Sequence, residues 1–96
     1  MSTAAPDRSI RKVVAIKAKP NASATLRDAL ATLERATRLE PGCRAFTFYQ
    51  ALTDEAVFLL IENFADAEAL ERHMQLPHTR TFFQAQLTDS IHVLDV

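Results

Sequence analysis

The chain has little or none of three residue types: cysteine, which forms disulfides, glycine, which forms tight loops, and tryptophan, which offers a large surface for aromatic stacking. It contains one cysteine, one glycine and no tryptophan among 96 residues. The lone Cys43 cannot form an intrachain disulfide, and this is compatible with a reducing cytoplasm. The lone Gly42 excludes the glycine-rich loops that cradle nucleotide phosphates. Disulfide-stapled scaffolds and nucleotide-binding folds of the glycine-rich kind are therefore excluded.

The chain also lacks an excess of positive charge and a long apolar run. Eleven Lys and Arg residues face twelve Asp and Glu residues, which gives a formal net charge of −1. A general nucleic-acid or anionic-membrane surface needs a basic excess, so we expect neither partner. No apolar run approaches the roughly 20 residues of a membrane span. Because residues Met1–Ser9 also lack the apolar core of a signal peptide, we expect a cytoplasmic protein.

What is present is the composition of one small globular domain. The hydrophobic fraction is 48% in 10.7 kDa. A chain of this size buries only about 60–65% of the surface that its unfolded form exposes, so its core is thin. We expect a tail over residues 1–9 and a single domain over residues 10–96. Apolar surface that one chain cannot cover should be covered by a second copy or by a ligand.

Hydrophobic periodicity predicts four strands and three helical segments. The strands are expected over residues 11–18, 43–50, 56–64 and 90–96, and the helices over residues 23–39, 67–76 and 79–87. Ser23 and Asp66 are the expected helix N-caps. Asn21 is suited to a turn that needs a positive φ. We expect the turn at Gly42 to require the backbone freedom of glycine.

The order of these elements predicts the fold class. Strand, helix, two strands, two helical segments and a strand form the split pattern of an α+β, ferredoxin-like fold, with a four-stranded antiparallel sheet and helices on one face. The third strand is apolar on both faces, which a sheet with one wet face would not be. One face carries Phe58, Leu60, Glu62 and Phe64, and the other carries Val57, Leu59 and Ile61. We therefore expect a homodimer in which two sheets pair face to face.

Three short motifs then point to a family. Pro41-Gly42-Cys43 follows an amphipathic helix, Glu62-Asn63-Phe64 ends a strand, and a helix carries His73-Met74-Gln75-Leu76-Pro77-His78. Together they resemble the antibiotic biosynthesis monooxygenase family over about Val13 to Val96. The family often has Trp at the position of Phe64. The resemblance implies a dimeric α/β barrel and the oxidation of quinol-like or polycyclic phenolic substrates by O₂ without a cofactor.

His73 and Glu62 are the candidate catalytic residues. His73 lies on the inner stripe of its helix, where an imidazole is able to take a phenolic proton near neutral pH. The alternative is a structural histidine that bonds to a backbone carbonyl or to Glu62. Glu62 lies in an apolar row, where a lone carboxylate is costly. It therefore pairs with His73 or an arginine, or has a raised pKa for proton transfer.

The candidate substrate-binding residues are three aromatic and two basic side chains. Phe64, Phe46 and Phe82 are expected to form walls of the pocket. His78 is expected to contact substrate or to hydrogen-bond locally as a helix cap, and Arg80 to steady an anionic intermediate. His73 and His78 are five residues apart across a proline, which does not place them on one helical face. We therefore expect no metal site.

The leading hypothesis is a dimeric monooxygenase that uses no cofactor, with a small aromatic substrate and O₂ as its partners. One rival is an isomerase of a small phosphorylated carbonyl compound, which would need a basic anchor such as Arg80. Another is a non-catalytic dimer that binds an aromatic metabolite. Such a binder would keep its affinity in a His73→Ala variant, whereas an oxygenase would lose turnover and keep binding.

Overall fold

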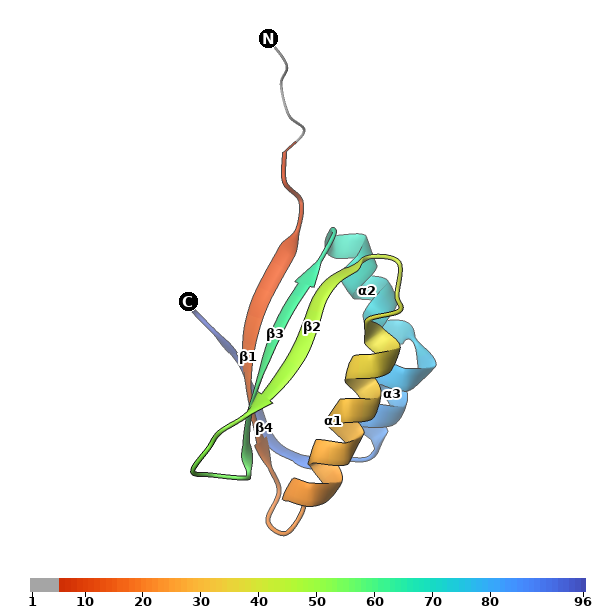
Figure 1. The fold of residues 1–96 in the computed structure, drawn as a ribbon. Coiled ribbons are helices and arrows are strands. Elements are labelled where there is room, and N and C mark those ends of the chain that lie inside the picture. Colours follow the sequence, from red (N-terminus) through yellow and green to blue (C-terminus); the bar gives the residue numbers. More distant parts are fainter. Residues whose placement is uncertain (1–5) are drawn as a thin grey trace.

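Seven elements follow one another in the predicted order (Figure 1). The computed structural model describes residues 6–96, and residues 1–5 of the expected N-terminal tail lie outside the described part. The elements are β1 (Ile10–Ala18), α1 (Ser23–Thr37), β2 (Cys43–Gln50), β3 (Val57–Phe64), α2 (Ala67–Gln75), α3 (Pro77–Gln84) and β4 (Thr88–Leu94). The helices expected from periodicity alone are therefore present.

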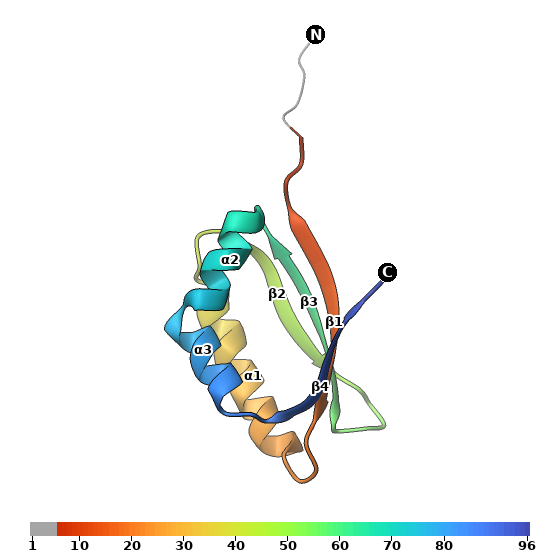
Figure 2. The same ribbon diagram turned by 180° about the vertical axis from the view of Figure 1, so that it is seen from behind.

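The four strands form one antiparallel sheet in the order β2-β3-β1-β4. All three helices lie on the same face of this sheet, as Figure 1 and the reverse view in Figure 2 both show. The α+β, ferredoxin-like fold is thereby confirmed. No helix within residues 6–96 is long and apolar enough to cross a membrane.

The core lies between the helices and the sheet. Its α1 side is a stripe of leucines at helical spacing, and its sheet side comes from alternate residues of β1, β2 and β3. The buried hydrophobic residues are Val14, Ile16, Ala18, Leu26, Leu30, Leu33, Phe46, Phe58, Leu60, Phe64, Ala69 and Phe82. Burial of this set holds α1 and the first turn of α2 against the sheet.

Proline sets the boundary between the last two helices. Pro77 ends α2, as predicted, but it is also the first residue of α3, which was expected to begin at Thr79. The first helical position tolerates proline because its N–H would have no intrahelical partner. Gln86 has a positive φ of 51° just after α3, and β4 begins at Thr88 rather than at residue 90.

The two predicted helix caps differ in outcome. Asp66 caps α2, since its side chain accepts a hydrogen bond from Ala69 N at 2.8 Å. Ser23 is wrong as a cap, because it is already the first residue of α1 and Ala22 occupies the cap position without a side-chain hydrogen bond. Asn21 has a φ of 64°, which confirms the predicted turn.

Gly42 is required for space and not for its φ. No glycine of the described chain has a positive φ, so the predicted need for backbone freedom is wrong. A Cβ at Gly42 would instead lie 2.3 Å from the Cβ of Ala69 in α2. The connection between α1 and β2 therefore passes directly against the first turn of α2.

The sheet face turned away from the helices carries an apolar row. Ile61 in β3 pairs with Val13 in β1, and Val13 pairs with Leu94 in β4. Side chains at directly opposed positions lie on the same face of a sheet. Ile61 is 42% exposed and Leu94 is 38% exposed, because no described element covers this face.

Candidate active site

A cavity of about 310 Å³ lies between the helix-facing side of the sheet and the helices α2 and α3. Its apolar lining is formed by Val14, Ile16, Leu33, Phe46, Phe48, Leu60, Leu70, Met74, Phe82, Phe83, Ile91 and Val93. Four polar side chains also line it, namely Lys12, Glu62, His73 and Thr79. An apolar cavity with a few convergent polar groups is the usual form of a small-molecule site.

His73 packs against two aromatic rings. The residue is 4% exposed, on the inward face of α2. Its ring centroid lies 4.9 Å from that of Phe64 and 5.3 Å from that of Phe46. Rings packed on two sides leave the imidazole little freedom to rotate. The orientation of His73 toward the cavity is therefore set by the core.

Glu40 holds the imidazole by one of its two nitrogens. One carboxylate oxygen, Oε2, lies 2.8 Å from His73 Nδ1 and 2.6 Å from His78 Nε2. A carboxylate only accepts hydrogen bonds, so both ring nitrogens that face it donate. Within residues 6–96, His73 Nε2 has no hydrogen bond. In the neutral ring this nitrogen then carries the lone pair, which is the form that a base needs.

The hydrogen-bond partner of His73 differs from the predicted one. We expected Glu62 to pair with His73, but the structure places Glu40 there. Glu40 immediately precedes the Pro41-Gly42 turn, in the connection between α1 and β2, where periodicity does not fix the direction of a side chain. His78 likewise bonds to Glu40 and not to a local helix group. The two histidines belong to different helices and still converge on one oxygen.

Glu62 lies instead in a cross-strand row with Lys12. Lys12 and Glu62 are directly paired between β1 and β3, and Phe46 of β2 pairs with Glu62 from the other side. Burial raises the pKa of the Glu62 carboxyl, and the nearby His73 and Lys12 oppose this rise. Lys12 was missed by the sequence interpretation. The signal was present, because Lys12 alternates with Val14 and Ile16 on the helix-facing side of β1.

The raised pKa of Glu62 predicts a change of stability with pH. Between about pH 4.5 and the raised pKa of the folded state, the Glu62 carboxyl is ionised in the unfolded chain but still protonated in the folded one. The free energy of unfolding of the wild type therefore falls as pH rises through this window. Glu62→Gln cannot ionise. We therefore expect its free energy of unfolding, relative to the wild type, to increase across this window and then level off. Urea unfolding over about pH 4–8 measures this difference in the free energy of unfolding, and Glu71→Gln at an exposed position is the control. A difference between Glu62→Gln and wild type that does not depend on pH would contradict the raised pKa of Glu62.

Only some of the other predicted substrate-binding residues line the cavity. Phe46 and Phe82 line the cavity, as expected. Phe64 does not, because it is fully buried behind the ring of His73. His78 is turned to Glu40, and Arg80 lies exposed on α3, so neither contributes to the lining. Phe64 thus supports the imidazole from behind.

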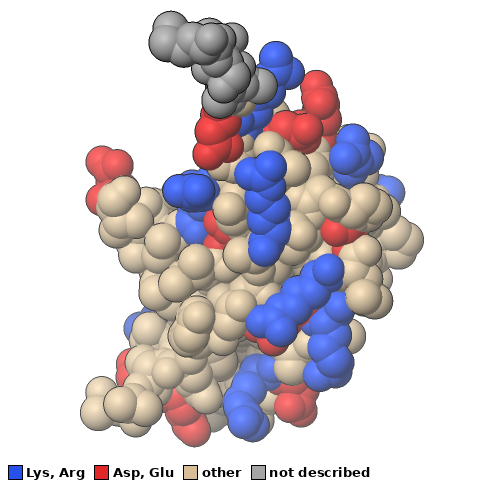
Figure 3. All heavy atoms as spheres, turned by 45° about the horizontal axis from the view of Figure 1, so that its top comes forward, with Lys and Arg blue, Asp and Glu red and all other residues tan. Residues whose placement is uncertain are grey.

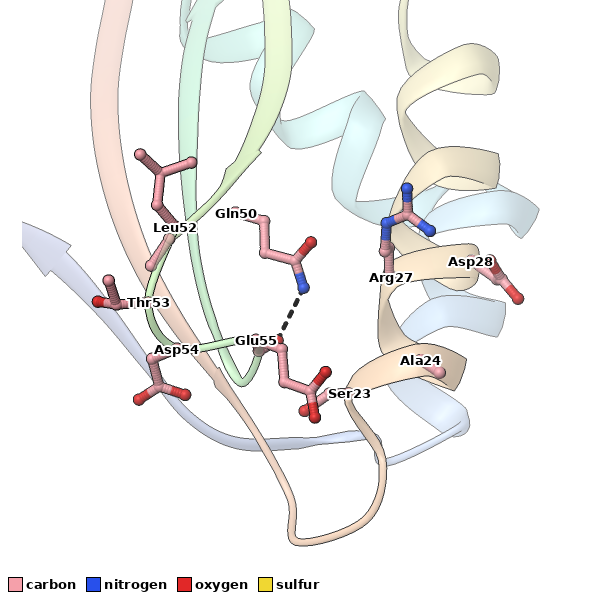
Figure 4. A pocket seen from close by; sticks show the side chains of 10 residues that line it. Ser23, Ala24, Arg27, Asp28, Gln50, Leu52, Thr53, Asp54 and Glu55 are labelled. Carbon is pink, nitrogen blue, oxygen red and sulfur yellow. Dashed lines mark hydrogen bonds between the residues drawn. The ribbon is translucent and has the colours of Figure 1, made fainter.

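Cys43 and a second hollow carry no comparable chemistry. Burial, followed by the charge of Glu40, raises the pKa of the Cys43 thiol, which disfavours a reactive thiolate there. The larger hollow lies at the other end of the sheet, where Gln50 and Glu55 face the start of α1 (Figure 4). There Gln50 Nε2 donates to the Glu55 carbonyl at 2.9 Å. Its lining is mostly exposed, so it lacks the dry surroundings of His73.

The surface charges are mixed. On the face shown in Figure 3, Lys and Arg side chains are interspersed with Asp and Glu. This distribution agrees with the formal net charge of −1. The site is distinguished instead by its partly buried Glu40–His73–His78 cluster and its apolar cavity.

Comparison with known proteins places this fold and site in a family. The family model described as "Antibiotic biosynthesis monooxygenase" matches residues 9–85. The chain belongs to the antibiotic biosynthesis monooxygenase family. The match includes the cavity residues from Lys12 in β1 to Phe83 in α3, whereas Ile91 and Val93 of β4 lie beyond it. The family resemblance drawn from the sequence motifs is thereby confirmed.

Individual proteins also resemble this chain in sequence and structure. An uncharacterized protein of Synechocystis, sll1783, is 32% identical over 69 residues, which is 72% of this chain and 47% of that protein. This chain thus spans about half the length of that relative. The crystal structure of PA3566 from Pseudomonas aeruginosa is 26% identical, with a TM-score of 0.85 over 93% of this chain and 92% of that one. A crystal structure named antibiotic biosynthesis monooxygenase is 25% identical, with a TM-score of 0.76 over 91% and 98% of the two chains.

Proposed function

We propose that this chain is a cofactor-independent monooxygenase that oxidises a small quinol or polycyclic phenol with O₂. The observation that carries the proposal is His73, whose Nδ1 is held by Glu40 while the ring lines an apolar cavity. A buried base at the wall of an apolar cavity suits the removal of a phenolic proton and the protection of a reactive intermediate from water. Membership of the monooxygenase family supports the same reaction class.

The reaction balances without another electron donor. His73 Nε2 takes the phenolic proton of a quinol, and the resulting phenolate gives one electron to O₂. The superoxide and the organic radical combine to form a C–O bond, and the peroxide takes the proton back from the imidazolium. Loss of the ring hydrogen with cleavage of the O–O bond then releases water. For 1,4-naphthoquinol, one molecule and one O₂ give 2-hydroxy-1,4-naphthoquinone and one water.

The rest of the cavity is suited to an aromatic phenolate. Lys12 is the one Lys or Arg side chain of the lining, and its charge favours the oxyanion form of the substrate. Phe46 and Phe82 offer apolar surface to the ring. A volume of about 310 Å³ is at the lower end of the range for ligand sites, which favours substrates of two or three fused rings.

Oxygen uptake tests the proposed activity. Metal-free protein is mixed with 1,4-naphthoquinol in the presence of EDTA, and the rate is compared with autoxidation in the same buffer without protein. We expect uptake well above autoxidation that is proportional to protein concentration. If neither 1,4-naphthoquinol nor a three-ring substrate such as anthrone, the keto tautomer of 9-anthrol, is consumed faster than in buffer, the proposal is wrong.

One observation favours a second candidate, the isomerase of a phosphorylated carbonyl compound. Arg80 lies outside the cavity, but Lys12 supplies the basic anchor that a phosphate would need. Conversion of such a compound under argon, with no uptake of O₂, would support this function. Tight binding of an aromatic compound without any turnover, unchanged in His73→Ala, would support the non-catalytic binder.

We also propose that the chain acts as a cytoplasmic homodimer. The row formed by Ile61, Val13 and Leu94 leaves apolar side chains on a face that no described element covers. A second sheet packed against this row would bury them. Ile61→Asp is expected to convert a dimer into a monomer in sedimentation velocity, while the fully exposed Leu52→Asp remains dimeric. A wild-type protein with the mass of one chain at 50 µM would contradict the dimer.

A further inference from the structure

The Glu40–His73–His78 cluster has the donor set of a transition-metal site. Its three ligand atoms, one carboxylate oxygen and two imidazole nitrogens, lie within 4.8 Å of one another. They come from three separate segments, which are the α1–β2 connection, α2 and α3. Two imidazoles and one carboxylate are ligands that Zn²⁺, Co²⁺ and Ni²⁺ bind well. We propose that the cluster binds one such divalent ion, and that the ion switches off His73 as a base.

The two oxygen–nitrogen spacings of the cluster are close to the spacing of neighbouring ligands about an ion. Metal–ligand bonds of about 2.1 Å put neighbouring ligands roughly 3 Å apart in octahedral geometry and about 3.4 Å apart in tetrahedral geometry. In the structure Glu40 Oε2 lies 2.8 Å from His73 Nδ1 and 2.6 Å from His78 Nε2. Octahedral coordination thus requires each oxygen–nitrogen spacing to lengthen by a few tenths of an ångström.

The ligands are held in place before any ion binds. The side chains of Glu40 and His73 are only 7% and 5% exposed, and the ring of His73 packs against Phe46 and Phe64. The His78 side chain is 25% exposed, so the ion has a route of entry from solvent and its remaining positions are open to water. A site formed in advance loses little conformational entropy when it binds.

Occupation of the site would exchange the roles of the two nitrogens of His73. A metal on Nδ1 displaces the proton that this nitrogen donates to Glu40, and a neutral imidazole then carries its proton on Nε2. The nitrogen that is free to accept a proton in the metal-free protein becomes a donor. This inhibitory consequence rests on the proposed oxygenase function, whereas metal binding itself does not.

Titration of untagged protein with Co²⁺ tests the binding. The protein is freed of metal with EDTA and desalted, and binding is followed by calorimetry and by the visible absorption of the cobalt ion. We expect one ion per chain and the weak absorption of a six-coordinate complex. Affinity should fall at least tenfold in Glu40→Gln and in His78→Gln. It should not change in His92→Gln, which removes the exposed imidazole of β4, and circular dichroism checks that each variant is folded.

The outcomes distinguish failure of the metal site from failure of the proposed oxygenase function. Absence of saturable Co²⁺ binding, or equal affinity in folded Glu40→Gln and wild type, would overturn the metal site. Loss of binding in His92→Gln would place the ion elsewhere and would overturn it as well. If Co²⁺ binds at this cluster but the metal-free protein consumes no quinol, the oxygenase fails and the site stands. If the metal-free protein is active, saturating Co²⁺ is expected to lower its rate at least tenfold, and an unchanged rate would overturn the switch.

Discussion

His73→Ala is expected to lower protein-dependent oxygen uptake by about 10²- to 10⁴-fold, which is the usual contribution of a positioned general base. Substrate affinity should change by only a few fold, because the aromatic lining from Phe46 and Phe82 remains. The two effects separate in a comparison of single-turnover rate with binding measured under argon.

The control for His73→Ala replaces a histidine that lies outside the cavity. His92 is exposed on β4 and lines no part of the cavity, so His92→Ala should keep the wild-type rate. His73→Ala leaves Glu40 and His78 bonded to each other, and thermal unfolding shows whether the variant remains folded. A folded His73→Ala protein with more than a tenth of the wild-type rate would remove His73 from the role of base.

Gly42→Ala is expected to destabilise the fold by about 1–3 kcal/mol, the usual cost of overpacking a filled site. The added Cβ would meet the Cβ of Ala69 at 2.3 Å, and Ala69 is 3% exposed in the first turn of α2. Because neither atom belongs to a flexible side chain, a backbone segment must move. For a domain of this size, each kcal/mol corresponds to roughly 4–8 °C in Tm.

A compensating substitution tests the cause of this destabilisation. Ala69→Gly removes the atom that Gly42→Ala would strike, and by itself it costs about 1 kcal/mol as a glycine in a helix. The double variant should therefore be more stable than the sum of the two single effects predicts, by at least 1 kcal/mol. Additive effects in urea unfolding, or a Gly42→Ala protein as stable as the wild type, would contradict the contact.

The fold was predictable because the hydrophobic periods change clearly along the chain. A helical stripe containing Leu26, Leu30 and Leu33 follows a strand rich in β-branched residues, and Asn21 marks the turn between them. The differences are confined to element ends. There the deciding factors are local, such as the first-position proline of α3, and periodicity says little about them.

The candidate site was predictable only where secondary structure sets the direction of a side chain. His73, Glu62, Phe46 and Phe82 all line the cavity because alternation and helical spacing place them there. Glu40 lies in a connection, and its contact with His73 depends on the packing of that connection against α2. A tertiary contact across 33 residues has no periodic signal in the sequence.

Labelled oxygen shows whether this chain inserts oxygen into an aromatic substrate without a cofactor, as we propose. Metal-free protein is given 1,4-naphthoquinol and ¹⁸O₂ in unlabelled water with EDTA, and the product is quenched quickly and analysed by mass spectrometry. A labelled hydroxyquinone standard kept in the same buffer corrects for exchange with water. We expect 2-hydroxy-1,4-naphthoquinone that carries one ¹⁸O atom, with little hydrogen peroxide. Unlabelled 1,4-naphthoquinone accompanied by an equal amount of hydrogen peroxide would show simple oxidation and would contradict the claim.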